Sequence, residues 1–302
     1  MDDAKTFSHN LKILLVINPK SRSGQLARDE VVKEVSSAGM ILLNKEEHTN
    51  DLDPNEIILK YRGDADLVIV GGGDGSVNQI LPAMRETQLP LLVLPLGTAN
   101  NLARTFNLPA NIKESLALLQ NFKTLLVDLG KVNDVLFVNV AGLGLSTEIN
   151  RHVSGGLKRY LGVLAFILTA FRLVLRMNPF RAMITVDGRE PFRSKSWQIS
   201  VCNGKYYGAG MAIKHNATLE DQKLHCLTTE VEKWWHGLAL IPALMTGRFK
   251  KEHDVTLVSG REIKIETRRK FAIDVDGDIK TSTPAVFTVI PKALNLIIPK
   301  DA

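Results

Sequence analysis

The best candidate for phosphate chemistry in this chain is a cluster of glycines around an acid, directly after an apolar run. Residues 70–78 read Val-Gly-Gly-Gly-Asp-Gly-Ser-Val-Asn, with Ser76 expected to be a helix N-cap. Glycines let backbone N–H groups approach a phosphate closely, and the start of a helix carries partial positive charge. The segment therefore predicts a phosphate-binding turn between a buried strand and a helix.

The segment matches neither of the two commoner phosphate-binding motifs. Gly71 and Gly73 give the first half of G-x-G-x-x-G, but Ser76 stands in place of the third glycine. The pattern G-x-x-x-x-G-K-[ST] does not occur in the sequence. Taken alone, the segment is also compatible with a glycine-rich turn that binds nothing.

The elements around this turn form a repeating pattern of strands and helices. Apolar runs predict strands at residues 12–17, 41–43, 66–70 and 91–94, and helical spacing predicts helices at 25–38, 55–61 and 77–84. This order predicts a parallel sheet with helices on both faces. Polar turns rich in Gly, Ser, Thr or Asn follow three strands, at 18–24, 71–78 and 97–101. Because open parallel sheets bind ligands beyond the carboxyl ends of their strands, we expect a nucleotide or phosphate site there.

After about Lys131 the pattern changes to short strand-like segments separated by turn residues. They lie at 135–140, 182–186, 198–201, 223–228, 255–258, 262–266, 271–275 and 285–289, with helical segments at 157–177 and 234–244. These segments predict a mostly antiparallel, β-sandwich-like domain. We therefore expect an α/β domain at residues 1–130, to which residues 292–302 return, and a β-rich domain at 131–291.

The charge balance favours an anionic partner. The chain of 302 residues has 38 Lys and Arg against 32 Asp and Glu, a net charge of +6. The basic clusters at 248–251 and 268–270 have no aromatic RNA-binding signature beside them. We therefore expect an anionic membrane surface as the partner, and no nucleic acid.

From the remaining sequence features we expect a cytoplasmic protein at the membrane periphery. Residues 1–10 have no basic and apolar leader, and the two cysteines, Cys202 and Cys226, lack metal-binding spacing. Segment 161–177 is apolar but short, and it contains Arg172 and Arg176. A membrane span would be longer and would exclude arginine, so this segment predicts a packed helix.

The motifs, in their order and spacing, resemble the diacylglycerol kinase catalytic-domain family, in particular its bacterial lipid kinases, relatives of sphingosine and ceramide kinases. The matching segments, which span nearly the whole chain, are 18–19 with 23–24, 72–75, 95–98, 142–149, 203–211 and 276–278. The resemblance implies transfer of the ATP γ-phosphoryl group, with Mg²⁺, to the hydroxyl of a lipid such as diacylglycerol or a sphingoid-like lipid. It also implies a nucleotide cleft between the α/β domain and a lipid-binding β-rich domain.

The resemblance also assigns residues to this nucleotide cleft. Asp74 would recruit Mg²⁺, and Asp278, where the family has glutamate, would accept the proton of the lipid hydroxyl. Without the resemblance, residues 276–278 predict a surface β-turn. The residues expected to bind the nucleotide or line its cleft are Asn18, Ser23, Gly24, Thr49, Gly72, Gly73, Asp74, Gly75, Ser76, Val77, Asn78, Gly97, Thr98 and Asn100.

A second Mg²⁺ site is implied in the β-rich domain. Members of the family can hold the ion there with one aspartate and two backbone carbonyls. The matching positions are Asp221 for the carboxylate and Thr218 and Lys223 for the carbonyls, with Gln222 in place of a glycine. A single carboxylate makes a weak oxygen-ligand site.

Departures from the family pattern leave two alternatives open. Gln79 and Asn101 stand where the family usually has acids, so a catalytically weak sensor or adaptor that binds nucleotide and lipid is one alternative. An NAD kinase-like enzyme, which shares the Gly-Gly-Asp-Gly turn, is the other, but segments 203–211 and 276–278 favour a lipid kinase. The lipid species is left open because acyl-chain pockets use interchangeable apolar residues, and a homodimer is compatible with the sequence.

Overall fold

A computed structural model of the chain describes residues 10–17, 24–44, 53–152, 178–204, 206–207, 211–212, 218–229 and 255–301. The chain divides into two compact units, here called unit 1 (Met1–Asp128 with Pro291–Ala302) and unit 2 (Leu129–Ile290). Several predictions fall outside the described residues: the site residues Asn18, Ser23 and Thr49, the helices at 157–177 and 234–244, and the basic cluster at 248–251.

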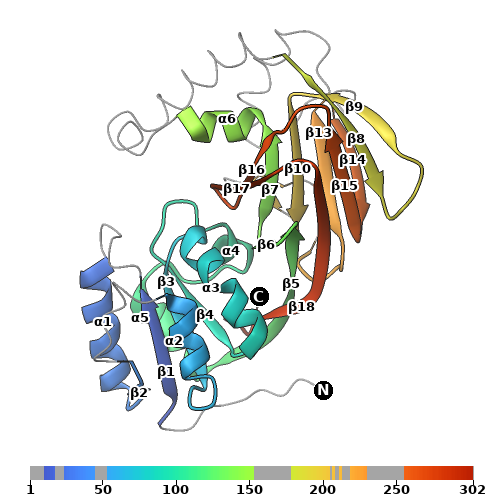
Figure 1. Cartoon of the computed structure of the whole chain (residues 1–302). Helices are drawn as coiled ribbons and strands as arrows, with labels where there is room; N and C mark the ends of the chain where they lie inside the picture. The colour runs from blue at the N-terminus through green and yellow to red at the C-terminus, as the bar shows by residue number, and fades with distance from the viewer. Residues whose placement is uncertain are drawn as a thin grey trace. The chain divides into compact units, whose positions relative to one another are not determined.

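Unit 1 contains a parallel sheet, as predicted (Figure 1). Its strands β1 (Lys12–Ile17), β2 (Ile41–Leu42), β3 (Leu67–Gly72) and β4 (Leu91–Pro95) lie in the order β2-β1-β3-β4. The last part of β18 (Ala285–Pro299) joins the sheet in parallel beside β4. The last five residues of β1 are all buried, because helices cover both faces of the sheet.

The helices of unit 1 pack in two groups. α1 (Gly24–Ser37) and α5 (Ile112–Ala117) contact each other and share a core with Ile13, Leu15 and Ile17 of β1. Since side chains alternate along a strand, the buried Leu14 and Val16 point to the opposite face. α2 (Pro54–Lys60) and α3 (Asp74–Thr87) pack against each other, with α3 also against β3. The short helices α4 (Asn101–Thr105) and η1 (Leu118–Gln120) complete the unit.

A side chain from α2 supports α3 where a proline interrupts it. Pro82 has no N–H and its ring disturbs the preceding helical turn. The Asn55 Nδ2 group donates to the Gln79 carbonyl at 2.9 Å, and the Ala83 N–H donates to Asn55 Oδ1 at 3.2 Å. In a regular helix these two backbone groups bond to each other. Asn55 therefore bridges the interruption and ties α2 to α3.

Unit 2 is a two-layer antiparallel β structure, which confirms the predicted fold class. One layer has the order β14-β13-β10-β7-β16-β17, and the other contains β15, β8 and β9 beside the first part of β18 (Figure 1). Leu143, Ile199 and Val275 of the first layer share a core with Ile184 and Phe287 of the second. The strands are β5 (Phe122–Val132), which begins in unit 1, β6 (Val135–Phe137), β7 (Val140–Gly144), β8 (Phe180–Val186), β9 (Phe192–Ser196), β10 (Gln198–Asn203), β11 (Tyr206–Tyr207), β12 (Met211–Ala212), β13 (Leu224–Thr229), β14 (Val255–Gly260), β15 (Glu262–Thr267), β16 (Ala272–Val275) and β17 (Asp278–Ser282), with helix α6 (Leu145–His152) after β7.

The single strand predicted at residues 135–140 is wrong. β6 pairs with β5, whereas β7 pairs with β10 and β16, so the chain changes sheets between the two strands. The physical reason is a distant carboxylate. Asp276 accepts the N–H groups of Val138, Asn139 and Val140 at 2.8, 3.0 and 2.9 Å, which diverts them from a strand ladder. Strand β5 was not predicted either.

The helices that the structure describes are short. α1 and α3, the longest of them, have 14 residues each. A helix needs about 20 apolar residues to cross a bilayer. Within the described ranges, no helix is long and apolar enough to do so.

Replacement of Asn55 by alanine is expected to destabilise the protein by about 1–3 kcal/mol, because it leaves the Gln79 carbonyl and the Ala83 N–H without their side-chain partner. The Pro82→Ala variant removes the ring that disturbs this turn, so the Ala83 N–H can bond to the Gln79 carbonyl directly, and it should reduce this loss. Urea unfolding of the wild type, both single variants and the double variant measures the coupling. Equal losses from Asn55→Ala in both backgrounds would contradict the bridging role.

Candidate functional site

The turns that follow β3 and β4 lie against each other at the carboxyl edge of the unit 1 sheet. The Leu96 N–H donates to the Gly72 carbonyl at 3.0 Å. A Cβ atom added to Gly97 would lie 2.4 Å from the Cα of Gly73, far inside contact distance. Only glycine fits at position 97, since the nearest atom belongs to the Gly73 backbone and cannot rotate away. The two predicted glycine turns therefore form one surface, built largely from main chain.

The Asp74 carboxylate fastens the second turn to the first. It accepts the backbone N–H groups of Asn101 at 3.0 Å and Leu102 at 3.2 Å, and the Asn101 side-chain amide at 3.3 Å. These N–H groups belong to the first turn of α4, where a helix favours a negative charge. Asp74 thus positions α4, and its binding of Mg²⁺ stays a prediction.

Asn100 shapes the second turn from within. Its backbone adopts a left-handed conformation, with φ of +48°. Its Oδ1 accepts the Gly97 N–H at 3.0 Å, and its Nδ2 donates to the carbonyls of Pro95 at 3.1 Å and Gly97 at 2.8 Å. Thr98, in the middle of this turn, is exposed. Asn100 therefore fixes the backbone that presents Thr98.

The predicted N-cap at Ser76 is wrong, because α3 begins at Asp74 with Gly73 as its N-cap. The bonds from Asp74 to α4 fix the start of the helix three residues earlier. Ser76 then lies in the first turn with its hydroxyl over Gly72, where a Cβ would be 2.2 Å from the Ser76 Oγ. The side chains of Val77 and Asn78, two predicted nucleotide contacts, are buried. Of the predicted nucleotide-binding residues in these turns, Gly75, Gly97 and Thr98 are exposed.

In unit 2, the acids at 274–278 divide into two that bond to backbone and one that is exposed. Asp276 bonds to the 138–140 segment, and Asp274 Oδ1 accepts the Gly277 N–H at 2.9 Å. Asp276 and Gly277 have φ of +50° and +102°, as a tight turn requires. Asp278, the predicted proton acceptor, opens β17 and is exposed.

Asn203 holds the same 138–139 backbone from a different strand. Its N–H donates to the Asn139 carbonyl at 2.9 Å, and its Nδ2 donates to the Val138 carbonyl at 3.0 Å. Asp276 binds the N–H groups of this segment and Asn203 binds its carbonyls. The role of residues 138–140 was missed by sequence reasoning, which treated them as the end of a strand. The one available signal was the position of Asn203 at the start of a family-like segment.

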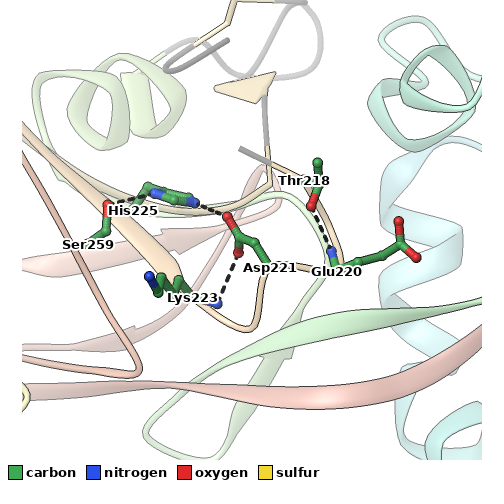
Figure 2. A network of polar contacts seen from close by, with 6 residues as sticks. All are labelled: Thr218, Glu220, Asp221, Lys223, His225 and Ser259. Atoms are coloured by element: carbon green, nitrogen blue, oxygen red, sulfur yellow. Dashed lines mark hydrogen bonds and ion pairs between the residues drawn. The ribbon is translucent and has the colours of Figure 1, made fainter. Parts of the chain in front are cut away.

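The predicted metal ligand Asp221 bonds to a histidine. Asp221 Oδ2 lies 2.9 Å from His225 Nε2, and Asp221 Oδ1 accepts the Lys223 N–H at 3.0 Å (Figure 2). The other ring nitrogen, His225 Nδ1, lies 2.8 Å from Ser259 Oγ on β14. The Glu220 N–H donates to Thr218 Oγ1 at 3.4 Å in the same loop. His225 is buried, so this network fixes the loop before β13 to the neighbouring strand.

The Mg²⁺ site at Asp221 stays a prediction, and its carboxylate already has other partners. Both carboxylate oxygens already accept hydrogen bonds, and an ion at Oδ2 would displace the imidazole. Gln222 takes a left-handed conformation with φ of +56°, so the turn forms without the family's glycine. Among the described residues, no group of three or more His, Cys, Asp or Glu side chains is arranged to hold a metal. The structure thus gives Asp221 an imidazole partner that sequence reasoning missed, because strand pairing places His225.

The His225 partner also affects the protonation of Asp221. Burial raises the pKa of this carboxyl, but the hydrogen bond and charge of His225 outweigh burial and hold the pKa below its ordinary 3.8. The backbone N–H of Lys223 acts in the same direction. The ionised form of Asp221 is therefore the one that the fold stabilises.

The chain combines glycine turns on a parallel α/β sheet with an antiparallel sandwich that follows in the sequence. Residues 12–132 match the family model described as the diacylglycerol kinase catalytic domain. Residues 139–298, more than half of the chain, match the YegS C-terminal NAD kinase beta sandwich-like domain. The chain therefore belongs to the diacylglycerol kinase catalytic-domain family, with a YegS-type C-terminal domain.

Individual relatives agree with the family models. A protein of Staphylococcus haemolyticus, named provisionally as a lipid kinase, is 26% identical over 255 residues that cover 80% of each chain. A crystal structure from Bacillus anthracis, named provisionally as a diacylglycerol kinase, has a TM-score of 0.79 and 26% identity over 100% of this chain and 99% of its own. Yeast NADH kinase, with a TM-score of 0.53 and 12% identity over 98% of this chain and 88% of its own, shares the fold.

Replacement of Gly97 by alanine should destabilise unit 1 by at least about 1–3 kcal/mol, because the added methyl group collides with the Gly73 backbone. Gly63→Ala is the matched control, since a Cβ at Gly63 meets no atom within 4 Å. Urea unfolding compares the two variants with the wild type. Similar midpoints for the two variants would show that the turns do not need this close approach.

Replacement of Asp221 by asparagine should destabilise the protein at neutral pH and have progressively less effect in acid. A carboxyl whose pKa is lowered by folding adds stability above its unfolded pKa and loses it as pH falls through the folded pKa. The stability difference between wild type and variant should therefore shrink below about pH 4. Urea unfolding from pH 7 to pH 3 measures it, and a difference independent of pH would refute the ionic contribution.

Proposed function

We propose that this protein is a lipid kinase that transfers the γ-phosphoryl group of Mg·ATP to the hydroxyl of a lipid such as diacylglycerol or a sphingoid-like lipid. The observation that carries the proposal is the joined pair of glycine turns at the end of β3 and β4. Family membership supports kinase chemistry, and the names of the relatives support a lipid acceptor.

The phosphates of ATP would be held mainly by backbone groups. The first N–H groups of a helix have no partner within the helix and carry partial positive charge, which suits an anionic phosphate. α3 begins directly at the glycine turn, and the exposed Gly75, Gly97 and Thr98 lie on the two turns. We include Asn18, Ser23, Gly24 and Thr49 in the same nucleotide site on the strength of the resemblance.

Asp278 is the acid best suited to take the proton of the lipid hydroxyl. Phosphoryl transfer to an alcohol needs an acceptor for this proton when the alcohol oxygen attacks the γ-phosphorus. Asp274 and Asp276 bond to backbone N–H groups, whereas Asp278 is exposed at the start of β17. Asp276 and Asp274 act as positioning residues, because their bonds fix the turn from which Asp278 projects.

One observation favours the sensor or adaptor as a second candidate. Asn101 stands where the family has an acid, and its amide donates to Asp74 at 3.3 Å. Its Oδ1 is buried and has no hydrogen-bond partner among the described residues. The junction of the two turns therefore carries one negative charge fewer than an acid at this position would give, which weakens the attraction for Mg²⁺.

Replacement of Asp278 by asparagine should lower lipid phosphorylation by about 10²–10⁴-fold, because the amide cannot accept the hydroxyl proton. The assay follows radiolabelled phosphate from ATP into diacylglycerol, ceramide, sphingosine or monoacylglycerol in mixed micelles. Asp134→Asn is the matched control in the same unit, since the Asp134 side chain is fully exposed and lies 3.8 Å from Lys131. Its activity should equal that of the wild type.

Each other outcome of this experiment has a distinct meaning. Equal incorporation by wild type and Asp278→Asn would remove Asp278 from its role. Phosphorylation of NAD in place of lipid would establish an NAD kinase-like enzyme. Tight binding of ATP and liposomes without turnover of any lipid would establish the sensor or adaptor.

A further inference from the structure

The outer surface of β8 and β9 carries exposed positive charge. Inward side chains such as Ala182 and Ile184 belong to the core of unit 2. The alternating side chains of Arg181, Arg193 and Lys195 point outward and are exposed. Arg181 and Lys195 are direct partners in the β8–β9 register, and like charges that face each other across strands are destabilising. The arrangement therefore costs stability in the isolated protein.

The loop after β15 adds three more exposed basic residues, Arg268, Arg269 and Lys270. Thr267, the last residue of β15, pairs with Ala182, so the loop begins beside Arg181. The Thr267 hydroxyl donates to the Arg269 carbonyl at 2.7 Å, which fixes the loop backbone. The basic sheet face is defined here as Arg181, Arg193, Lys195, Arg268, Arg269 and Lys270.

Neighbouring acids do not neutralise the basic sheet face. On β15, Glu266 lies opposite Met183 but pairs with Lys264 at 3.1 Å. In the part of the chain that the structure describes, no ion pair involves any of the six basic residues. The Arg269 guanidinium lies 5.7 Å from the centre of the Phe271 ring, which orients it without reducing its charge. Three exposed positive charges thus lie on the outward side of β8 and β9, and three more follow in the loop that begins beside Arg181.

We propose that the basic sheet face docks unit 2 on an anionic lipid bilayer. Each basic residue near an anionic membrane contributes about 1 kcal/mol of attraction, and an outward sheet face offers several of them to a flat surface together. Single-stranded nucleic acid would also need aromatic platforms for its bases, and the face has only the half-buried Phe271 beneath Arg269. The biological reason for docking rests on the proposed function, since a lipid kinase must reach its substrate in a membrane.

The position of the face within unit 2 suits this purpose. β16, with four residues, connects the basic loop to the Asp276–Asp278 turn. A strand of this length spans about 13 Å. Docking through the loop would therefore place the exposed carboxylate of Asp278 within about one short strand of the lipid headgroups.

A simpler explanation applies to part of the face and makes a different prediction. β9 is the last strand of its sheet, and charged side chains on edge strands prevent pairing with other molecules. Removal of the charges would then cause self-association and leave membrane binding unchanged. This explanation does not cover residues 268–270, which lie in a loop.

The test compares two triple variants with the same loss of charge. One neutralises the face with Arg193→Gln, Lys195→Gln and Arg268→Gln, and the control changes the exposed Lys33, Arg85 and Lys113 of unit 1 to Gln. Binding is measured by co-sedimentation with two kinds of vesicle. One is phosphatidylcholine alone, and the other contains about a third phosphatidylglycerol, an anionic lipid. The face variant should bind the anionic vesicles about 100-fold more weakly than wild type. The control variant should change far less, and added salt should weaken wild-type binding.

Two further measurements separate the possible failures. Thermal unfolding and light scattering show whether each variant is folded and monodisperse. Turnover of a short-chain, water-soluble lipid should be unchanged in the face variant, while turnover of the same headgroup in anionic vesicles should fall. Selective vesicle binding without any lipid turnover would refute the kinase and keep the docking face. Equal vesicle binding by both variants, with or without self-association of the face variant, would overturn the docking proposal.

Discussion

The approach of the Gly73 and Gly97 backbones is the constraint on which the candidate site depends. The two turns meet at a distance that leaves no room for a side chain on Gly97, so their surface is made of peptide groups. Asp74 can bond to the first turn of α4 because the turns lie this close. A surface of this kind meets an anion with oriented N–H dipoles, which need no reorganisation when the ligand arrives.

Most acids in the motifs of this chain hold neighbouring segments in place through hydrogen bonds. Asp74 binds the first turn of α4, Asp276 binds three consecutive N–H groups, and Asp221 binds an imidazole and an N–H group. A carboxylate that accepts several such bonds fixes two segments of chain together. Asp278 differs, because it is exposed at the start of β17. This contrast supports the proposed role of Asp278 as the proton acceptor.

The parts of the fold that sequence predicted are those determined by local pattern. Continuous apolar runs that end in turn residues located β1, β3 and β4, since a strand buried on both faces has no polar alternation. The order of the glycine turns then located the candidate site. The helix start near Ser76 was misplaced because Gly73, Asp74 and Ser76 are all acceptable near a cap, and the choice depends on bonds from Asp74 to Asn101 and Leu102.

The parts that sequence did not predict depend on residues far along the chain. The break between β6 and β7 follows from Asp276, more than 130 residues away, and no local signal at 138–139 marks it. His225 meets Ser259 because β13 pairs with β14, a register that is set by the whole layer. Local pattern cannot report such partners, because they are chosen only when the sheets assemble.

At two departures from the family pattern, a carboxylate bonds to a side chain of the protein. An acid at position 101 would place a second carboxylate near Asp74, where two like charges repel unless a cation lies between them. The Asn101 amide instead donates to Asp74 and closes the junction within the chain. At Asp221, the imidazole of His225 likewise occupies the oxygen that a cation would need. In both places an internal hydrogen bond holds the carboxylate that a cation would approach.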